Sequence, residues 1–149
     1  DPQLLNNYGT FLCEQGDYAD GIEHFLRAAQ NRLYETPAYA YANAGRCARR
    51  AERPEEAREY LRKALSADKR MASALYDLAS LEYAQGRTSS AKRYIDRFHE
   101  VATPAPQSLW LAIRVERRLG NRAAAERHGK QLLRKFPDSR AADRFLETR

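Results

Sequence analysis

Apolar and small residues recur along this chain at helical spacings, in two alternating patterns. Four successive segments carry such residues at their fourth, seventh and eighth positions, which form one stripe of a helix with 3.6 residues per turn. We expect these residues to line the inner face of a first helix in each segment: Leu5, Tyr8 and Gly9; Tyr41, Ala44 and Gly45; Leu75, Leu78 and Ala79; Leu109, Ala112 and Ile113. A second helix follows in each segment with its own stripe: Gly21, Phe25 and Ala28; Ala57, Leu61 and Ala64; Ala91, Ile95 and Phe98; Ala125, Gly129 and Leu132. No strand-like alternation is sustained, so the pattern predicts an all-helical chain.

The small residue that opens each second stripe sets a period. Gly21, Ala57, Ala91 and Ala125 are separated by 36, 34 and 34 residues, and a helix–turn–helix unit of about 34 residues is the tetratricopeptide repeat (TPR). The sequence therefore predicts an all-α, right-handed superhelix of four helix pairs plus a C-terminal capping helix. We expect a single TPR array over residues 1–149, with units at about 2–37, 38–71, 72–105 and 106–139 and the capping helix at 140–149.

Some positions depart from a regular repeat. The first interval implies a two-residue insertion near residues 34–37. Phe98 is large where alanine is usual, and Gly129 leaves a gap where a bulky residue is usual, so the fourth unit is the least regular. Terminal repeats need a cover for their apolar face, and we expect Ala141, Phe145 and Leu146 to supply it.

The charge of the chain raises the question of a nucleic-acid partner. Lysine and arginine exceed aspartate and glutamate by six, although a solvated basic surface is the commoner meaning of such an excess. No stretch approaches the roughly 18 apolar residues of a membrane span, and no signal peptide is recognisable. The chain opens directly inside a repeat, which suggests a fragment or a processed form.

The sequence offers little for catalysis. The histidines, His24, His99 and His128, fall on second helices of three different units without a metal-ligand spacing, and we expect each to lie at the surface. No glycine-rich phosphate loop is present. The chain is therefore predicted not to be an enzyme and to need no metal or cofactor, and no small-molecule substrate is expected.

The first helices carry an unusual set of side chains at the positions that line the concave groove of a TPR array. Six arginines and four large aromatic residues stand there, with no lysine and with Glu14 as the only acid. Tyrosine, tryptophan and arginine dominate binding hot spots, although some of these aromatic residues could instead fill gaps between helices. The predicted partner-binding groove comprises Asn6, Tyr39, Arg46, Arg49, Arg50, Tyr76, Tyr83, Trp110, Arg114, Arg117 and Arg118.

The two cysteines, Cys13 and Cys47, fall on the first helices of adjacent units. Neighbouring first helices could bring the thiols close together. From the residues alone, two buried thiols and a disulfide both remain open, because pairing depends on the redox compartment.

Five segments resemble one family within the TPR proteins. They are NNYGTFLCEQG at 6–16, LYETPA at 33–38, NAGRC at 43–47, SLWLAIR at 108–114 and FPDS at 136–139. In this order they resemble the PilF/PilW family of type IV pilus biogenesis lipoproteins, the pilotins of the pilus secretin. The resemblance runs over nearly the whole chain and includes the insertion in the first unit.

The resemblance implies a scaffold at the periplasmic face of the bacterial outer membrane that binds secretin subunits and assists their localisation and assembly. Family members carry a lipobox cysteine and usually further repeats ahead of this region; this chain shows neither, so membrane association is expected only through an anchor outside it. The implied oxidising compartment favours a Cys13–Cys47 disulfide.

Two other functions remain possible at this point. A co-chaperone-type module that clamps a C-terminal carboxylate would use Asn7 and Asn43 with Arg46, although Thr10 replaces a basic residue of such a clamp. A nucleic-acid-binding helical array would also use basic and aromatic side chains, but related RNA-reading repeats have a different unit length. We therefore expect a protein partner, with no nucleic acid.

Overall fold

The computed structural model describes all residues from 1 to 149 and contains helices as its only regular elements. Their bounds are α1 Pro2–Glu14, α2 Tyr18–Gln30, α3 Pro37–Arg50, α4 Pro54–Ala67, α5 Ala72–Ala84, α6 Thr88–Val101, α7 Pro106–Arg118, α8 Arg122–Lys135 and α9 Arg140–Thr148. The second helices α2, α4, α6 and α8 begin 36, 34 and 34 residues apart. The all-helical fold and its period are therefore confirmed.

The predicted insertion lies in the loop between α2 and α3. That loop spans residues 31–36, whereas the corresponding loops before α5 and α7 span only 68–71 and 102–105. Proline opens α1, α3, α4 and α7, where its missing N–H would have had no partner inside the helix. The extra residues are thus absorbed outside the helices, and the helix pairs keep their length.

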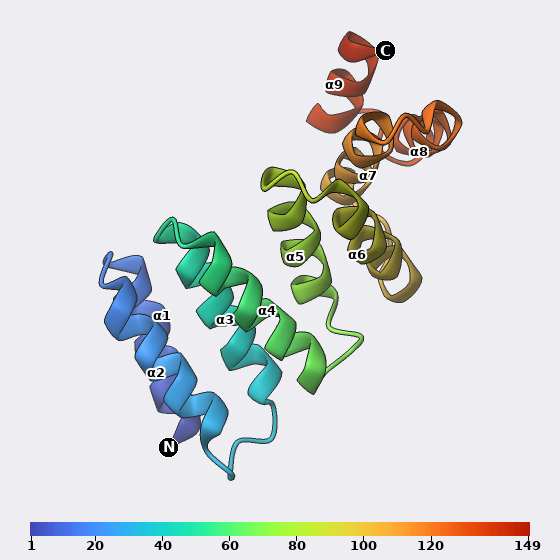
Figure 1. Cartoon of the computed structure of the whole chain (residues 1–149). Coiled ribbons are helices and arrows are strands. Elements are labelled where there is room, and N and C mark those ends of the chain that lie inside the picture. The colour runs from blue at the N-terminus through green and yellow to red at the C-terminus, as the bar shows by residue number, and fades with distance from the viewer. The chain divides into compact units, whose positions relative to one another are not determined.

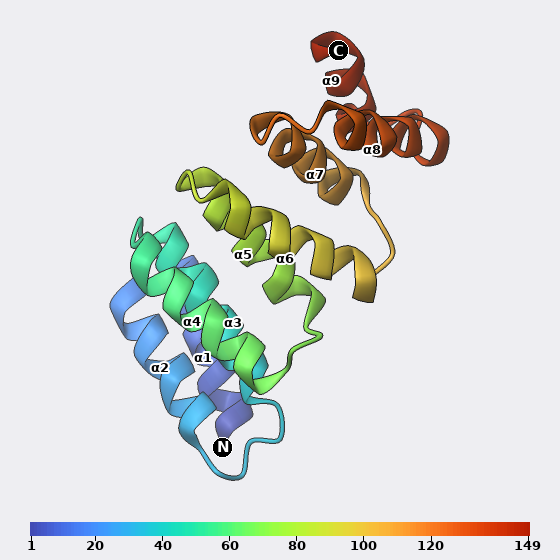
Figure 2. The same ribbon diagram turned by 45° about the vertical axis from the view of Figure 1, so that its right-hand side comes forward.

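The chain divides into two compact units that are each larger than a single repeat, a first unit, Asp1–Leu78, and a second unit, Ala79–Arg149, with the boundary inside α5. In the first unit, α1 pairs with α2, α3 pairs with α4, and α2 also lies against α3 (Figure 1). In the second unit, α7 contacts α6, α8 and α9, and α9 also contacts α8 (Figure 2). Each unit therefore has the layered helix-on-helix packing of a repeat protein.

Both predicted stripes are largely buried. Leu75, Leu78, Leu109 and Ile113 of the first helices are fully enclosed, as are the stripe residues of the second helices other than Phe98. Five residues are more exposed than expected. Leu5, Tyr41 and Phe98 are only partly buried, Tyr8 is half-exposed, and Leu146 of the capping helix is exposed while Ala142 is buried in its place.

The turn after each first helix contains one residue with a positive φ. Three of these residues are glycines, Gly16 at 87°, Gly86 at 79° and Gly120 at 81°, but the fourth is Glu52 at 59°. The N–H of Glu52 donates to the carbonyl of Arg49 and that of Arg53 to the carbonyl of Ala48, at 3.0 and 2.9 Å. This is the Schellman ending, which favours glycine at the left-handed position because a Cβ crowds the backbone there.

Replacing Glu52 by glycine is therefore expected to stabilise the protein. The gain should be about 0.5–1 kcal/mol, since the relief of backbone crowding exceeds the added entropy of the unfolded chain. Urea unfolding followed by circular dichroism measures it. Gly120→Ala is the matched control, and it should destabilise by a similar amount. If both changes move stability in the same direction, the backbone explanation is wrong.

Candidate partner-binding surfaces

A row of polar side chains crosses the first helices of the first unit. The side-chain amide of Asn43 donates to Asn6 Oδ1 at 3.0 Å, and the guanidinium of Arg46 donates to Asn43 Oδ1. Arg46 Nη1 also lies 2.9 Å from Asp77 Oδ2 on α5. Asn6 is buried rather than facing solvent, and Arg46 is already paired. These two predicted groove residues therefore hold α1, α3 and α5 in register.

The same row bears on the carboxylate-clamp alternative. Asn43 uses its amide on Asn6 and its oxygen on Arg46. Asn7 accepts a hydrogen bond of 3.0 Å from the side chain of Gln3. Both asparagines that such a clamp would need are thus engaged by neighbouring side chains, which disfavours that alternative.

A pocket of about 360 Å³ opens beside this row in the first unit. Its lining residues are Gly45, Arg46, Arg49, Arg50, Leu61 and Asp77. Arg49 and Arg50 are exposed, while Leu61 belongs to the core and gives the pocket an apolar wall. An apolar wall beside exposed guanidinium groups suits a partner segment that presents an apolar side chain next to a carboxylate. Of the other predicted residues here, Tyr39 is exposed and Tyr76 is half-buried.

In the second unit, the predicted aromatic and arginine residues come together. The guanidinium carbon of Arg118 lies 3.7 Å from the ring centroid of Tyr83, and Arg118 Nη1 donates to the Tyr83 carbonyl at 2.9 Å. Arg114 lies between two rings, 5.1 Å from Tyr83 and 5.6 Å from Trp110. Arg117 lies 5.8 Å from Trp110. These cation–π contacts fix the arginine side chains, so less rotamer entropy is lost when a partner binds.

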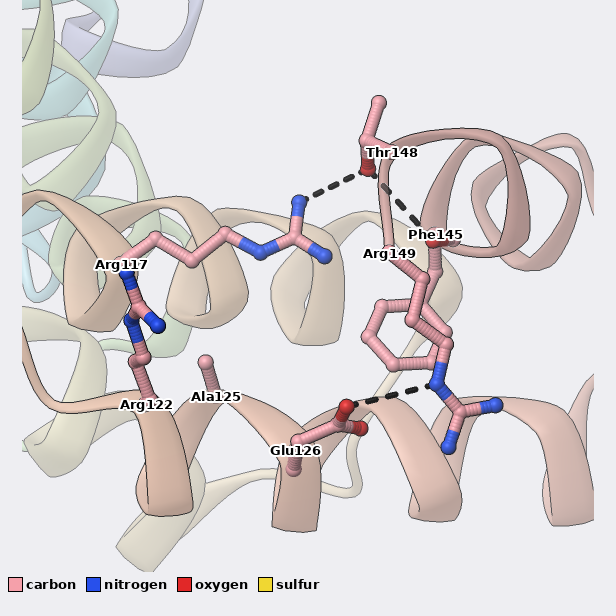
Figure 3. Close-up of a pocket in the computed structure, with 7 residues that line it drawn as sticks. All are labelled: Arg117, Arg122, Ala125, Glu126, Phe145, Thr148 and Arg149. Atoms are coloured by element: carbon pink, nitrogen blue, oxygen red, sulfur yellow. Dashed lines mark hydrogen bonds and ion pairs between the residues drawn. The ribbon is translucent and has the colours of Figure 1, made fainter.

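A second pocket, of about 480 Å³, lies next to this cluster among α7, α8 and α9. Its lining residues are Arg117, Arg122, Ala125, Glu126, Phe145, Thr148 and Arg149 (Figure 3). Arg117 donates to Thr148 Oγ1 at 2.8 Å, and Arg149 Nε lies 3.3 Å from Glu126 Oε1. Three arginines against one glutamate leave this pocket positive, with Phe145 as its apolar wall.

Sequence reasoning missed several residues of these surfaces. Asp77 stands at the sixth position of its repeat, the position that Asn7 and Asn43 occupy in theirs. The repeat register could therefore have predicted that Asp77 lies in the same row as Asn43. Arg122 opens α8, and Thr148 and Arg149 end the chain. No repeat position marks these three residues as pocket-lining, because only the packing of α9 brings them together.

The expectation of surface histidines is wrong for two of the three. His99 and His128 are partly buried in the second unit with ring centroids 6.1 Å apart, and His99 Nε2 lies 2.9 Å from Ser108 Oγ. Burial, with a smaller contribution from His128, lowers the pKa of His99 to about 4. Burial also lowers the pKa of His128. His99 is therefore uncharged at neutral pH and packs as part of the α6–α7 contact.

A partly buried ion pair joins the same two helices. Lys92 of α6 donates to Glu116 Oε1 on α7, and Lys92 Nζ also lies 3.2 Å from Asp96. Burial alone would raise the pKa of Glu116, but the hydrogen bonds from Lys92 and Asn121 outweigh it and lower the pKa. The hydrogen bond to Glu116 in turn raises the pKa of Lys92. Both groups are thus held in their charged forms, and removing Lys92 would leave the buried carboxylate of Glu116 without its charge partner.

The two cysteines lie side by side in the first unit. The structure joins Cys13 of α1 and Cys47 of α3 as a disulfide, with their Cα atoms 5.9 Å apart, a separation that suits such a bond. Both side chains are buried.

Other kinds of site find little support in the structure. No three histidine, cysteine, aspartate or glutamate side chains lie close enough together to hold a metal ion. None of the helices is both long and apolar enough to span a membrane.

Comparison with known proteins gives a consistent family. Tetratricopeptide-repeat models match residues 2–70 and 48–107. The type IV pilus assembly protein PilF of Pseudomonas aeruginosa strain PAO1 is 32% identical over 137 residues, covering 92% of this chain. The match takes in 54% of that protein, so the chain spans about half the length of this curated relative.

Solved structures agree with this match. A structure of P. aeruginosa PilF superposes with a TM-score of 0.85 at 30% identity, covering 100% of this chain and 67% of that one. A structure of PilW, described as a widely conserved type IV pilus biogenesis factor, gives a TM-score of 0.88 at 28% identity, covering 98% of this chain and 67% of that one. The chain therefore belongs to the tetratricopeptide-repeat proteins and, within them, to the PilF/PilW-like proteins of type IV pilus biogenesis.

Proposed function

We propose that this protein is a non-catalytic scaffold that binds subunits of the pilus secretin and assists their localisation and assembly at the periplasmic face of the outer membrane. The family membership supports a protein-interaction role in type IV pilus biogenesis. The observation that carries the choice of surface is the gathering of arginine and aromatic side chains on the first helices of both units.

The second unit supplies preorganised contacts. Arg114, Arg117 and Arg118 are held by Tyr83, Trp110 and Phe145 at 3.7 to 5.8 Å between guanidinium and ring. Planar guanidinium groups recognise carboxylates through two parallel hydrogen bonds, and side chains that are already ordered lose little entropy on binding. We infer that this cluster orients an acidic stretch of the partner.

The first unit supplies the exposed charges. Arg49 and Arg50 lie at the rim of the 360 Å³ pocket, and both are exposed. Arg46 is less suited to direct binding, because Asp77 already pairs with it. We infer that the rim arginines meet carboxylates of the partner while the pocket takes an adjacent apolar side chain.

Arg50→Glu is the variant that tests this surface most cleanly. We expect it to weaken binding of the purified periplasmic part of the pilus secretin from the same bacterium by about tenfold, since it replaces an attractive charge with a repulsive one. Isothermal titration calorimetry at low and high salt measures the effect, which should shrink as salt screens the charges. Circular dichroism should show an unchanged melting temperature, because Arg50 is exposed.

Arg27→Glu is the matched control. Arg27 is also exposed and also lies in the last turn of its helix, but it is on the second helix α2. It should leave the affinity unchanged. Equal losses in the two variants would indicate unspecific attraction, and no loss in either would place the interface elsewhere. Tight, salt-sensitive binding of a single-stranded oligonucleotide would favour the nucleic-acid alternative instead.

Charge reversals at Arg46 or Arg114 would test this surface less cleanly than Arg50→Glu. A glutamate at position 46 would face Asp77 directly, and Arg114 Nε is already enclosed in the protein. Trp110→Ala would likewise remove packing from the core around Leu109 and Phe145. Each of these changes would lower stability together with any loss of binding.

A further inference from the structure

The excess positive charge of the chain is confined to its second unit. Residues 79–149 hold 15 lysine and arginine residues against 8 aspartate and glutamate residues, whereas residues 1–78 hold 11 against 12. A basic excess that served only to keep the protein soluble would have no reason to gather in one half of the chain. The uneven distribution therefore points to a local feature of the second unit.

The outer face of α8 carries the clearest part of this charge. Arg127, Lys130 and Arg134 are all exposed, and their spacing of three and then four residues places them on one face of the helix. None of these three side chains forms a hydrogen bond or an ion pair within the protein. The neighbouring acid, Glu126, pairs instead with Arg149 at 3.3 Å (Figure 3). The three cations, which we call the α8 strip, thus present unneutralised charge to the outside.

The repeat provides a comparison for this face. The equivalent positions of the other second helices hold Glu23, Leu26 and Gln30 in α2, Glu59, Arg62 and Ser66 in α4, and Arg93, Asp96 and Glu100 in α6. Each of those sets contains an acid, and none has a net positive charge. A helix C-terminus favours cations in its last turn, which takes in Arg134 but neither Arg127 nor Lys130. Neither the repeat nor the helix dipole therefore accounts for the α8 strip.

We propose that the α8 strip is a contact surface for the headgroups of anionic phospholipids. It lacks the features by which a protein partner is usually anchored: α8 contains no tyrosine, tryptophan or phenylalanine, and its two leucines are buried or partly buried. What remains is a row of long, flexible, unpaired cations. Such a row suits a bilayer surface, which offers many negative charges without a fixed shape.

The strength of this contact follows from the number of cations. Each lysine or arginine close to an anionic bilayer strengthens binding by about fivefold, so the strip provides a weak and reversible contact. The role of the strip rests on the proposed function, because a scaffold held at the outer membrane would use it to fix which side of the second unit faces the lipid. The strip shares no residue with the arginine-rich surfaces proposed for the secretin, so the two contacts do not compete for side chains.

Co-sedimentation of the purified chain with lipid vesicles tests the proposal. The chain is expected to bind vesicles of phosphatidylglycerol and phosphatidylcholine, mixed at about 3:7, and to ignore vesicles of phosphatidylcholine alone. Raising the salt from about 0.05 M to about 0.5 M should release it, because salt screens the charges. The triple substitution Arg127→Gln, Lys130→Gln and Arg134→Gln should lower the partition coefficient by at least about tenfold. Its melting temperature should stay within about 2 °C of the native value, since glutamine keeps the helix propensity of these exposed positions.

Arg27→Gln with Arg62→Gln and Arg70→Gln is the matched control, because it removes the same net charge from exposed residues of the first unit. It should keep vesicle binding within about twofold. Equal losses in the two triple variants would overturn the proposal, since attraction would then follow net charge alone, and so would a failure to bind the anionic vesicles. Strip-dependent binding of an oligoglutamate peptide without vesicle binding would also overturn it and assign the strip to an acidic protein segment. The secretin titration contains no lipid, so the two proposals fail independently.

Discussion

Replacing Phe145 by alanine is expected to lower the free energy of unfolding by about 3 kcal/mol, a large effect for a residue so near the end of the chain. Phe145 is only 1% exposed, and it completes an apolar cluster with Leu109, Ile113 and Leu132. Removing a buried aromatic ring costs both its transfer from water and the cavity it leaves. Urea unfolding followed by circular dichroism measures the loss. The exposed Leu146→Ala on the same helix is the control, and it should change stability by less than about 0.5 kcal/mol.

Gly129 on α8 gives this prediction a sharper form. A Cβ added there would lie 2.0 Å from Phe145 Cζ, so Gly129→Ala is expected to destabilise by about 2 kcal/mol through overpacking. In the Phe145→Ala background the same change should be neutral or stabilising, because the methyl group then enters the vacated space. The two substitutions are thus expected to be strongly non-additive. Additive losses would contradict the proposed contact.

The contact between Gly129 and Phe145 also shows where the sequence alone is misleading. From the repeat pattern, Gly129 is a gap that makes the fourth repeat irregular. In the structure the ring of Phe145 fills that gap, so the glycine is required by close packing. The repeat pattern predicts residues within a unit well, because their positions follow from the helical period. It does not predict which side chain of the following helix fills a space.

The exposure of Tyr8 also departs from the repeat pattern. Its position is buried in the other repeats, and α2 packs against α3 as α6 packs against α7. Periodicity alone therefore predicts burial for Tyr8. The groove positions show a further limit. Repeat arithmetic places Arg46 on the first helices, but its pairing with Asp77 depends on side-chain conformations across two helices. Which of the predicted groove residues bind a partner stays a prediction.

Reducing the disulfide between Cys13 and Cys47 is expected to lower the free energy of unfolding by about 3–4 kcal/mol. The two residues are 34 positions apart in sequence, and the bond removes conformational entropy from the unfolded chain in proportion to the logarithm of that loop. The bond ties α1 to α3, so the loss should fall on residues 1–78. Urea unfolding with and without reductant measures it.

Two controls separate the bond from other effects of reductant. The double variant Cys13→Ala with Cys47→Ala should unfold at the same urea concentration in both conditions, and near that of the reduced native chain, since alanine replaces the small buried thiols with little loss of packing. Thiol titration of the denatured, unreduced protein should find no reactive thiol, because these are the only cysteines of the chain. Two titratable thiols per chain, in protein recovered from an oxidising compartment, would show that α1 and α3 are held by packing alone.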